Sequence, residues 1–128
     1  MVAAARQALL DLEAGLAAGA KATVVPRDEE IRELTDFDRS GFDLATEDLD
    51  WKLSALVSVN RRHGAVKIVG ANAFNRCLGL PRSHSTIFLF DKLTMLPLAM
   101  LDGTDISAIR TGAYASIAAD LFYAPRGS

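Results

Sequence analysis

Two cationic residues differ from their surroundings: Lys67 lies in the apolar run VKIV, and Arg110 lies in a helical pattern of isoleucines and alanines. An arginine presents a rigid fork that matches a carboxylate, and a lysine adds a compact positive charge, so the pair could hold an anionic ligand. A lysine in a short buried strand is costly without a partner. Lys67 therefore either reaches solvent along its apolar stem or meets an anion, and the pattern leaves both readings open.

The other reactive residue types lack the partners that their chemistry requires. His63 and His84 have no acidic or cysteine ligand at metal-binding spacing, and Cys77 has no neighbouring base. We therefore predict neither a metal site nor a cysteine nucleophile. The glycines at 70 and 79 match neither a phosphate-binding loop nor a dinucleotide turn, and no serine lies in a GxSxG turn, which argues against a hydrolase.

Periodic patterns predict the elements that would position these cations. The strand around Lys67 alternates, so the lysine is expected on the face opposite to its two apolar neighbours. Arg110 lies beside the apolar stripe of a helix that opens at Thr104 or Asp105, whose side chains are expected to cap it. We expect helices over residues 2–18 and from residue 104 to a stop at Pro125 and Gly127, and strands over residues 21–25, 53–60, 65–69, 85–90 and 96–101.

Two stretches leave alternatives open. Residues 27–50 hold most of the sixteen acidic residues of the chain and show little periodicity. This stretch is either a solvated loop with one helical turn over residues 28–34 or a lid on the substrate side. The last two predicted strands are almost continuously apolar, as expected if both faces of the hairpin are covered or if one face forms an oligomer interface.

Composition narrows the class of protein. A chain of 128 residues suffices for one domain with its own core. The net charge of -2 argues against nucleic-acid binding, which needs a basic face. A single cysteine excludes an internal disulfide and favours a cytoplasmic protein. No apolar run approaches the length that a bilayer requires, so we expect no membrane partner.

Residues 66–122 closely resemble the first half of the ornithine cyclodeaminase/mu-crystallin family. The matching features, in order and spacing, are a lysine in a VKIV strand, a GLPR loop, the hairpin segments IFLFD and LPLAMLDG, and a helix with IRTGA. The resemblance implies an α+β fold in which a mostly antiparallel sheet packs with an N-terminal and a C-terminal helix. In the family this unit binds substrate and dimerises, and a Rossmann domain that binds NAD or NADP follows it.

The resemblance also implies roles for particular residues. By position, Lys67 matches the lysine that holds the substrate carboxylate, and we assign it as a catalytic and substrate-binding residue. Arg110 matches the arginine that faces both substrate and cofactor, and Thr111 follows it as in the family. We therefore assign Arg110 to substrate and cofactor binding and Thr111 to cofactor binding. The upstream substrate arginine has no secure counterpart; we select Arg27, with Arg39 as the competitor.

A departure from the family pattern concerns the loop before the first hairpin strand. Arg82 stands where cyclodeaminases commonly have a threonine near the cofactor, and we assign it to cofactor binding. The LPRSHS version is more similar to opine-type and carboxyalkyl-amino-acid dehydrogenases, in which an arginine suits an additional anionic group on the substrate.

Two functions follow as hypotheses. The sequence contains neither the glycine-rich turn nor the catalytic aspartate of the family's second domain, so residues 1–128 are expected to be the substrate-binding and dimerisation part of a larger two-domain protein. That protein would be an NAD(P)-dependent oxidoreductase or a cyclodeaminase, which is a lyase, in amino-acid metabolism, acting as a homodimer on a small amino acid or imino acid. The alternative is a truncated, non-catalytic member that serves as a dimeric binding module.

Overall fold

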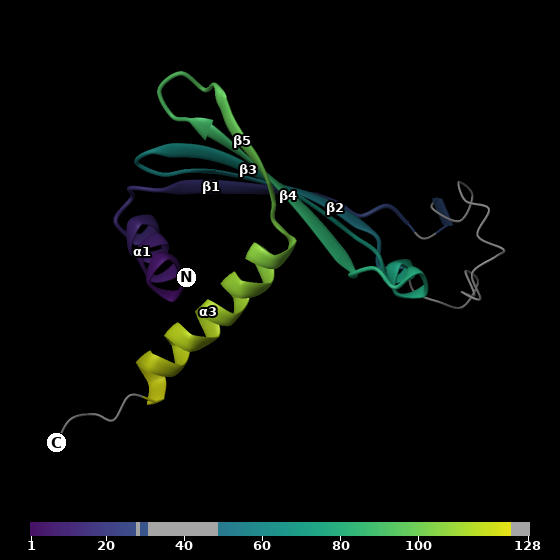
Figure 1. The fold of residues 1–128 in the computed structure, drawn as a ribbon. Helices are drawn as coiled ribbons and strands as arrows, with labels where there is room; N and C mark the ends of the chain where they lie inside the picture. The colour runs from purple at the N-terminus through teal and green to yellow at the C-terminus, as the bar shows by residue number, and fades with distance from the viewer. Residues whose placement is uncertain (28, 31–48, 124–128) are drawn as a thin grey trace.

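The fold is built on a five-stranded antiparallel sheet in which every strand pairs with its neighbour in sequence, in the order β1-β2-β3-β4-β5 (Figure 1). The computed structural model describes residues 1–27, 29–30 and 49–123. The predicted lid or loop, the competitor Arg39 and the predicted helix stop at Pro125 lie mainly or wholly outside these residues. The strands are β1 (Ala18–Val24), β2 (Lys52–Val59), β3 (His63–Ala71), β4 (Ser83–Asp91) and β5 (Pro97–Asp102).

Two helices, α1 (Val2–Glu13) and α3 (Thr104–Tyr123), lie on the same side of this sheet (Figure 1). They pack through a small apolar cluster of Ala5, Ala113 and Ile117. At the surface, the guanidinium of Arg6 donates a hydrogen bond of 3.0 Å to the carboxylate of Asp120. Small side chains let the two helix backbones approach, so α3 packs against α1 while its start lies against β4 (Figure 1). The expected α+β class is confirmed, and no described helix is long and apolar enough to span a membrane.

The strand register determines which side chains face the helices. Lys21 pairs with Leu56, Leu56 with Lys67, and Lys67 with Ile87. Paired residues in an antiparallel sheet share a face, so these four side chains form a row across β1 to β4. Lys67 is therefore on the face opposite to Val66 and Ile68, as the alternation predicts, and the start of α3 lies on this face, where Ser107 contacts Lys67.

The opposite face of the sheet, which we call the outer face, is apolar and exposed. The register places on it six exposed hydrophobic residues: Val24, Leu53, Val57, Val59, Ile68 and Met100. Met100 is 70% exposed and Val57 is 53% exposed. The described residues leave this face of the last hairpin open, so the expectation that both faces are covered is wrong for the part of the chain that the structure describes.

Several element boundaries differ from the sequence-based expectations. Helix α1 ends at Glu13 rather than near residue 18, because Gly15 turns the chain with a φ of +73° and β1 begins at Ala18. The loop after β3 contains a short 3-10 helix, η1 (Ala73–Leu78), which the pattern did not indicate. The side chain of Asn72 accepts a hydrogen bond from the backbone N–H of Asn75 and caps this helix.

The junction between β5 and α3 also differs from the prediction. Neither Thr104 nor Asp105 accepts a helix amide among the described residues. Instead, the hydroxyl of Thr104 accepts the backbone N–H of Ser85 at 3.1 Å, and the carboxylate of Asp102 accepts the backbone N–H of Thr104 at 2.9 Å. The start of α3 is thereby bonded to both β4 and β5, and the carboxylate of Asp102 on β5 accepts the first amide of the helix.

Candidate anion-binding site

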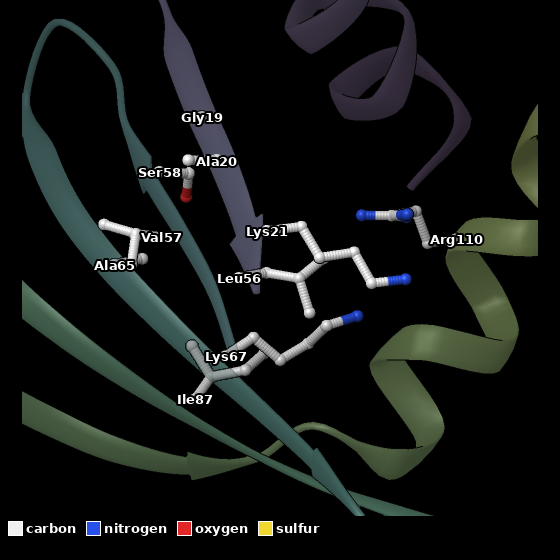
Figure 2. A pocket seen from close by; sticks show the side chains of 10 residues that line it. All are labelled: Gly19, Ala20, Lys21, Leu56, Val57, Ser58, Ala65, Lys67, Ile87 and Arg110. Carbon is white, nitrogen blue, oxygen red and sulfur yellow. The ribbon is translucent and has the colours of Figure 1, made fainter. Parts of the chain in front are cut away.

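An open pocket of about 440 Å³ lies between α3 and the face of the sheet that carries Lys67 (Figure 2). Its apolar floor includes Leu56 and Ile87, and three cations project into it. Lys21 comes from β1, Lys67 from β3 and Arg110 from α3. The two cations that the sequence singled out are therefore brought together in one pocket, and the structure adds a third.

Lys67 is half-buried and held in place by the helix. Its ammonium group donates a hydrogen bond of 3.2 Å to the hydroxyl of Ser107. That hydroxyl also lies 3.3 Å from the hydroxyl of Ser85, a buried residue on β4. The serine pair orients the lysine toward the pocket and leaves ammonium protons of Lys67 for a ligand.

The pKa of Lys67 is lowered from its ordinary value. Burial is the main cause, and repulsion by Arg110 and then by Lys21 adds to it. Burial disfavours the charged form of a lysine, and nearby like charges act in the same direction. An anion bound among the three side chains would relieve this repulsion, which is the electrostatic property of a binding site for a carboxylate or another acid group.

Arg110 reaches the pocket from the middle of α3. Its guanidinium carbon lies 5.2 Å from the centre of the Tyr114 ring, which steadies the cation without neutralising it. Figure 2 shows the Arg110 guanidinium facing the ends of the Lys21 and Lys67 side chains. Among the described residues, no acidic side chain lines this pocket and none forms an ion pair with these three cations.

Lys21 was not predicted as a site residue from the sequence. The strand around it was predicted, but nothing in its own segment marks its face. The signal lies in the pairing of β1 with β2, because only the register Lys21 to Leu56 to Lys67 brings the two lysines to one face. A pattern read along one strand does not contain that information.

Three other residues with predicted roles lie outside the pocket lining. Arg27 follows β1 and forms an ion pair with Glu30 at 3.0 Å. Arg82 precedes β4 and is ion-paired with Asp50. The hydroxyl of Thr111 donates to the backbone carbonyl of Ser107 at 3.0 Å. The structure therefore does not bring Arg27, Arg82 or Thr111 together with Lys67, and their predicted roles stay predictions. No group of metal-binding side chains occurs among the described residues.

The fold and the pocket together define the class of protein: an α+β domain with a cationic pocket between a sheet and a helix. Residues 26–128 match the model of the ornithine cyclodeaminase/mu-crystallin family, and the chain belongs to this family. The resemblance found over residues 66–122 is thus confirmed.

Solved structures share the fold. The chain is similar to an archaeal alanine dehydrogenase dimer with bound NAD, with a TM-score of 0.72, 22% identity, and coverage of 93% of this chain and 31% of the other. For Δ(1)-pyrroline-2-carboxylate reductase of Thermococcus litoralis in complex with NADH and L-proline, the TM-score is 0.69, the identity 24%, and the coverage 93% and 32%. For CmnK the TM-score is 0.62 and the identity 20%, and the match covers 89% of this chain and 31% of the other.

The chain thus spans about a third of the length of these solved structures. No curated protein matches it.

Proposed function

We propose that residues 1–128 form the substrate-binding and dimerisation domain of a larger, two-domain NAD(P)-dependent oxidoreductase or cyclodeaminase that acts on a small amino acid or imino acid. The observation that carries the proposal is the convergence of Lys67 and Arg110, from two different elements, on one pocket that no acidic side chain lines in the described part of the chain. Family membership supports the same assignment. So do the folds of the alanine dehydrogenase with bound NAD and of the pyrroline-2-carboxylate reductase with bound NADH. The proposal includes a cytoplasmic location, which the cysteine content favours.

In this proposal the substrate carboxylate binds between Arg110 and Lys67. The arginine fork would engage both carboxylate oxygens, and the ammonium of Lys67, oriented by Ser107, would engage one of them. The two groups come from α3 and β3, so the carboxylate is fixed in direction as well as position. The α-carbon would then point out of the open side of the pocket, where a second domain can reach it.

The proposed cofactor is NAD or NADP, held mainly by residues outside this chain. The nicotinamide supplies hydride transfer when it is bound. Of the residues assigned to it here, Arg110 is the one that lines the pocket, and no described acidic residue pairs with it, which suits contact with an anionic group. To contact the cofactor, Arg82 would have to give up its ion pair with Asp50. Thr111 would likewise have to give up the hydrogen bond from its hydroxyl to the backbone carbonyl of Ser107.

The dimerisation part of the proposal rests on the outer face of the sheet. Exposed apolar surface of this extent, spread over β1, β2, β3 and β5, is typical of an interaction site. A second copy of the chain is the partner we propose, and the alanine dehydrogenase with the same fold is described as a dimer.

The test is a kinetic comparison in the complete protein that carries this chain. Arg110→Leu and Lys67→Met should each raise the KM for the amino or imino acid by roughly tenfold or more, since each removes a charge-assisted contact. Arg62→Leu, in the exposed turn between β2 and β3, is the control and should leave KM unchanged. Near-normal turnover by Arg110→Leu would contradict the assignment, and absence of any NAD(P)-linked reaction would favour the non-catalytic binding module.

A further inference from the structure

The pocket holds one more cation than a single carboxylate needs. A carboxylate offers about four acceptor positions on its two oxygens, and the proposed contacts from Arg110 and Lys67 already use most of them. Lys21 remains, with no ion pair and no hydrogen bond from its ammonium group among the described residues. Three like charges that face one another repel, and a singly charged ligand would leave two of them uncompensated.

The row across the sheet sets the distance between the two lysines. Lys21 and Lys67 lie two strands apart, with Leu56 between them, so their backbones are separated by ~10 Å. Both side chains extend from the sheet toward α3, and Arg110 faces them (Figure 2). The spacing leaves room for a second acid group beside Lys21 while the first lies between Lys67 and Arg110.

We propose that this pocket takes a substrate with two acid groups, a dicarboxylic amino, imino or oxo acid, in which Lys21 binds the second carboxylate. The assignment of the first carboxylate to Lys67 and Arg110 rests on the function proposed above. The side chains of Leu56 and Ile87 form an apolar floor against which the carbon chain between the two carboxylates packs. Lys21 then acts as a specificity-determining residue.

Charge decides between a dicarboxylate and a neutral amino acid. A neutral amino acid carries an ammonium group next to its carboxylate, which adds a fourth positive charge to the pocket. A second carboxylate supplies one more negative charge, with which Lys21 can pair directly, so the ligand then carries a net negative charge into the cationic pocket. The resemblance to opine-type enzymes connects an additional anionic group with Arg82, but Arg82 is ion-paired with Asp50 and does not line the pocket. Lys21 is the cation in position to bind it.

The experiment compares glutarate with butanoate, which have similar carbon chains and differ by one carboxylate. Each acid is titrated into the full chain, and the shifts of the lysine and arginine side-chain resonances are followed by NMR. Glutarate should bind roughly tenfold more tightly than butanoate, because a charge-assisted hydrogen bond is added. Lys21→Met should reduce this preference to less than about twofold, and Lys21→Arg should retain it.

The control is Lys92→Met, which removes the same charge from the exposed turn between β4 and β5 and should keep the preference. Lys21 is itself exposed, so its substitution should leave the fold intact. If both acids bind equally well and binding depends on Arg110, the dicarboxylate proposal is wrong and the carboxylate site stands. If neither acid perturbs Lys67 or Arg110 at saturating concentration, both proposals are wrong.

Discussion

The ammonium group of Lys67 donates a hydrogen bond to the hydroxyl of Ser107, which lies on the helix that carries Arg110. Ser107 and Arg110 are one helical turn apart, so the same turn of α3 holds one cation of the pocket and orients the other. The bond therefore connects the strand and the helix at the point where the proposed carboxylate binds. Strand β4 is connected as well, through Ser85.

Replacing Ser107 with alanine should weaken anion binding without unfolding the chain. The hydroxyl accepts a hydrogen bond from the charged lysine and stabilises its protonated form, so Ser107→Ala should lower the pKa of Lys67 further. Glutarate should bind roughly three- to tenfold more weakly. NMR titration of the Lys67 side chain measures both effects.

Two variants distinguish orientation of Lys67 from general stability. Ser107→Thr keeps a hydroxyl and should retain most of the binding. Ser85→Ala removes the hydroxyl beyond it, which should lower the free energy of unfolding by about 1 kcal/mol and leave the pKa of Lys67 nearly unchanged. An unchanged Lys67 pKa in Ser107→Ala would show that the hydrogen bond does not act on the lysine in solution.

Lys67 should make the folded chain more stable at alkaline pH than at neutral pH. Its pKa is lower in the folded chain than in the unfolded chain, because of burial and then repulsion by Arg110 and Lys21. The unfolded state therefore binds the proton more tightly, and the destabilising effect is complete below the folded-state pKa. It disappears as the pH rises from that pKa toward the ordinary lysine value.

Lys67→Met tests this effect through urea unfolding at several pH values. The variant should be more stable than the original chain at neutral pH, and the difference should shrink as the pH rises through that window. Anion binding by the original chain should weaken over the same rise, because the lysine loses its charge. Lys92→Met should leave the pH dependence of unfolding unaltered, and a Lys67→Met variant with the original pH dependence would contradict the assignment.

Gly103 is required where β5 passes into α3. A Cβ atom at this position would lie 2.7 Å from the hydroxyl oxygen of Ser85 and 2.9 Å from Cγ1 of Ile87. Gly103→Ala should therefore lower the free energy of unfolding by about 1–3 kcal/mol and displace the start of α3, with a matching loss of anion binding. Thermal unfolding and the glutarate titration measure the two effects.

Gly112 provides the matched control on the same helix. A Cβ atom there meets nothing within 4 Å, so Gly112→Ala should stabilise the chain by about 0.5–1 kcal/mol. Equal stability changes for the two alanine variants would show that the close approach of Gly103 to β4 is absent in solution.

Local patterns were sufficient for the strands and for the face of Lys67, and the family resemblance implied a shared site for Lys67 and Arg110. They were insufficient where the outcome depends on pairing between distant segments. The selection of Lys21 requires the register of β1 on β2, and the connection from Lys67 through Ser107 to Ser85 joins residues from three separate elements. The 3-10 helix depends on one asparagine cap within a loop rich in turn residues, which gives no periodic signal.

The outer face of the sheet should hold two copies of the chain together. Ile68 on the central strand β3 and Met100 on β5 are both exposed on this face, at 39% and 70%. A charge placed there would be buried without a partner in a dimer, so Ile68→Glu and Met100→Glu should each dissociate it. Light scattering coupled to size exclusion should then give the mass of one chain, whereas the original chain gives twice that mass.

Leu93→Glu is the control, because Leu93 is 93% exposed in the turn between β4 and β5 and its substitution should leave the dimer intact. A dimer that survives both substitutions on the outer face would exclude this face as the interface, and dissociation by all three variants would indicate that added charge alone is responsible.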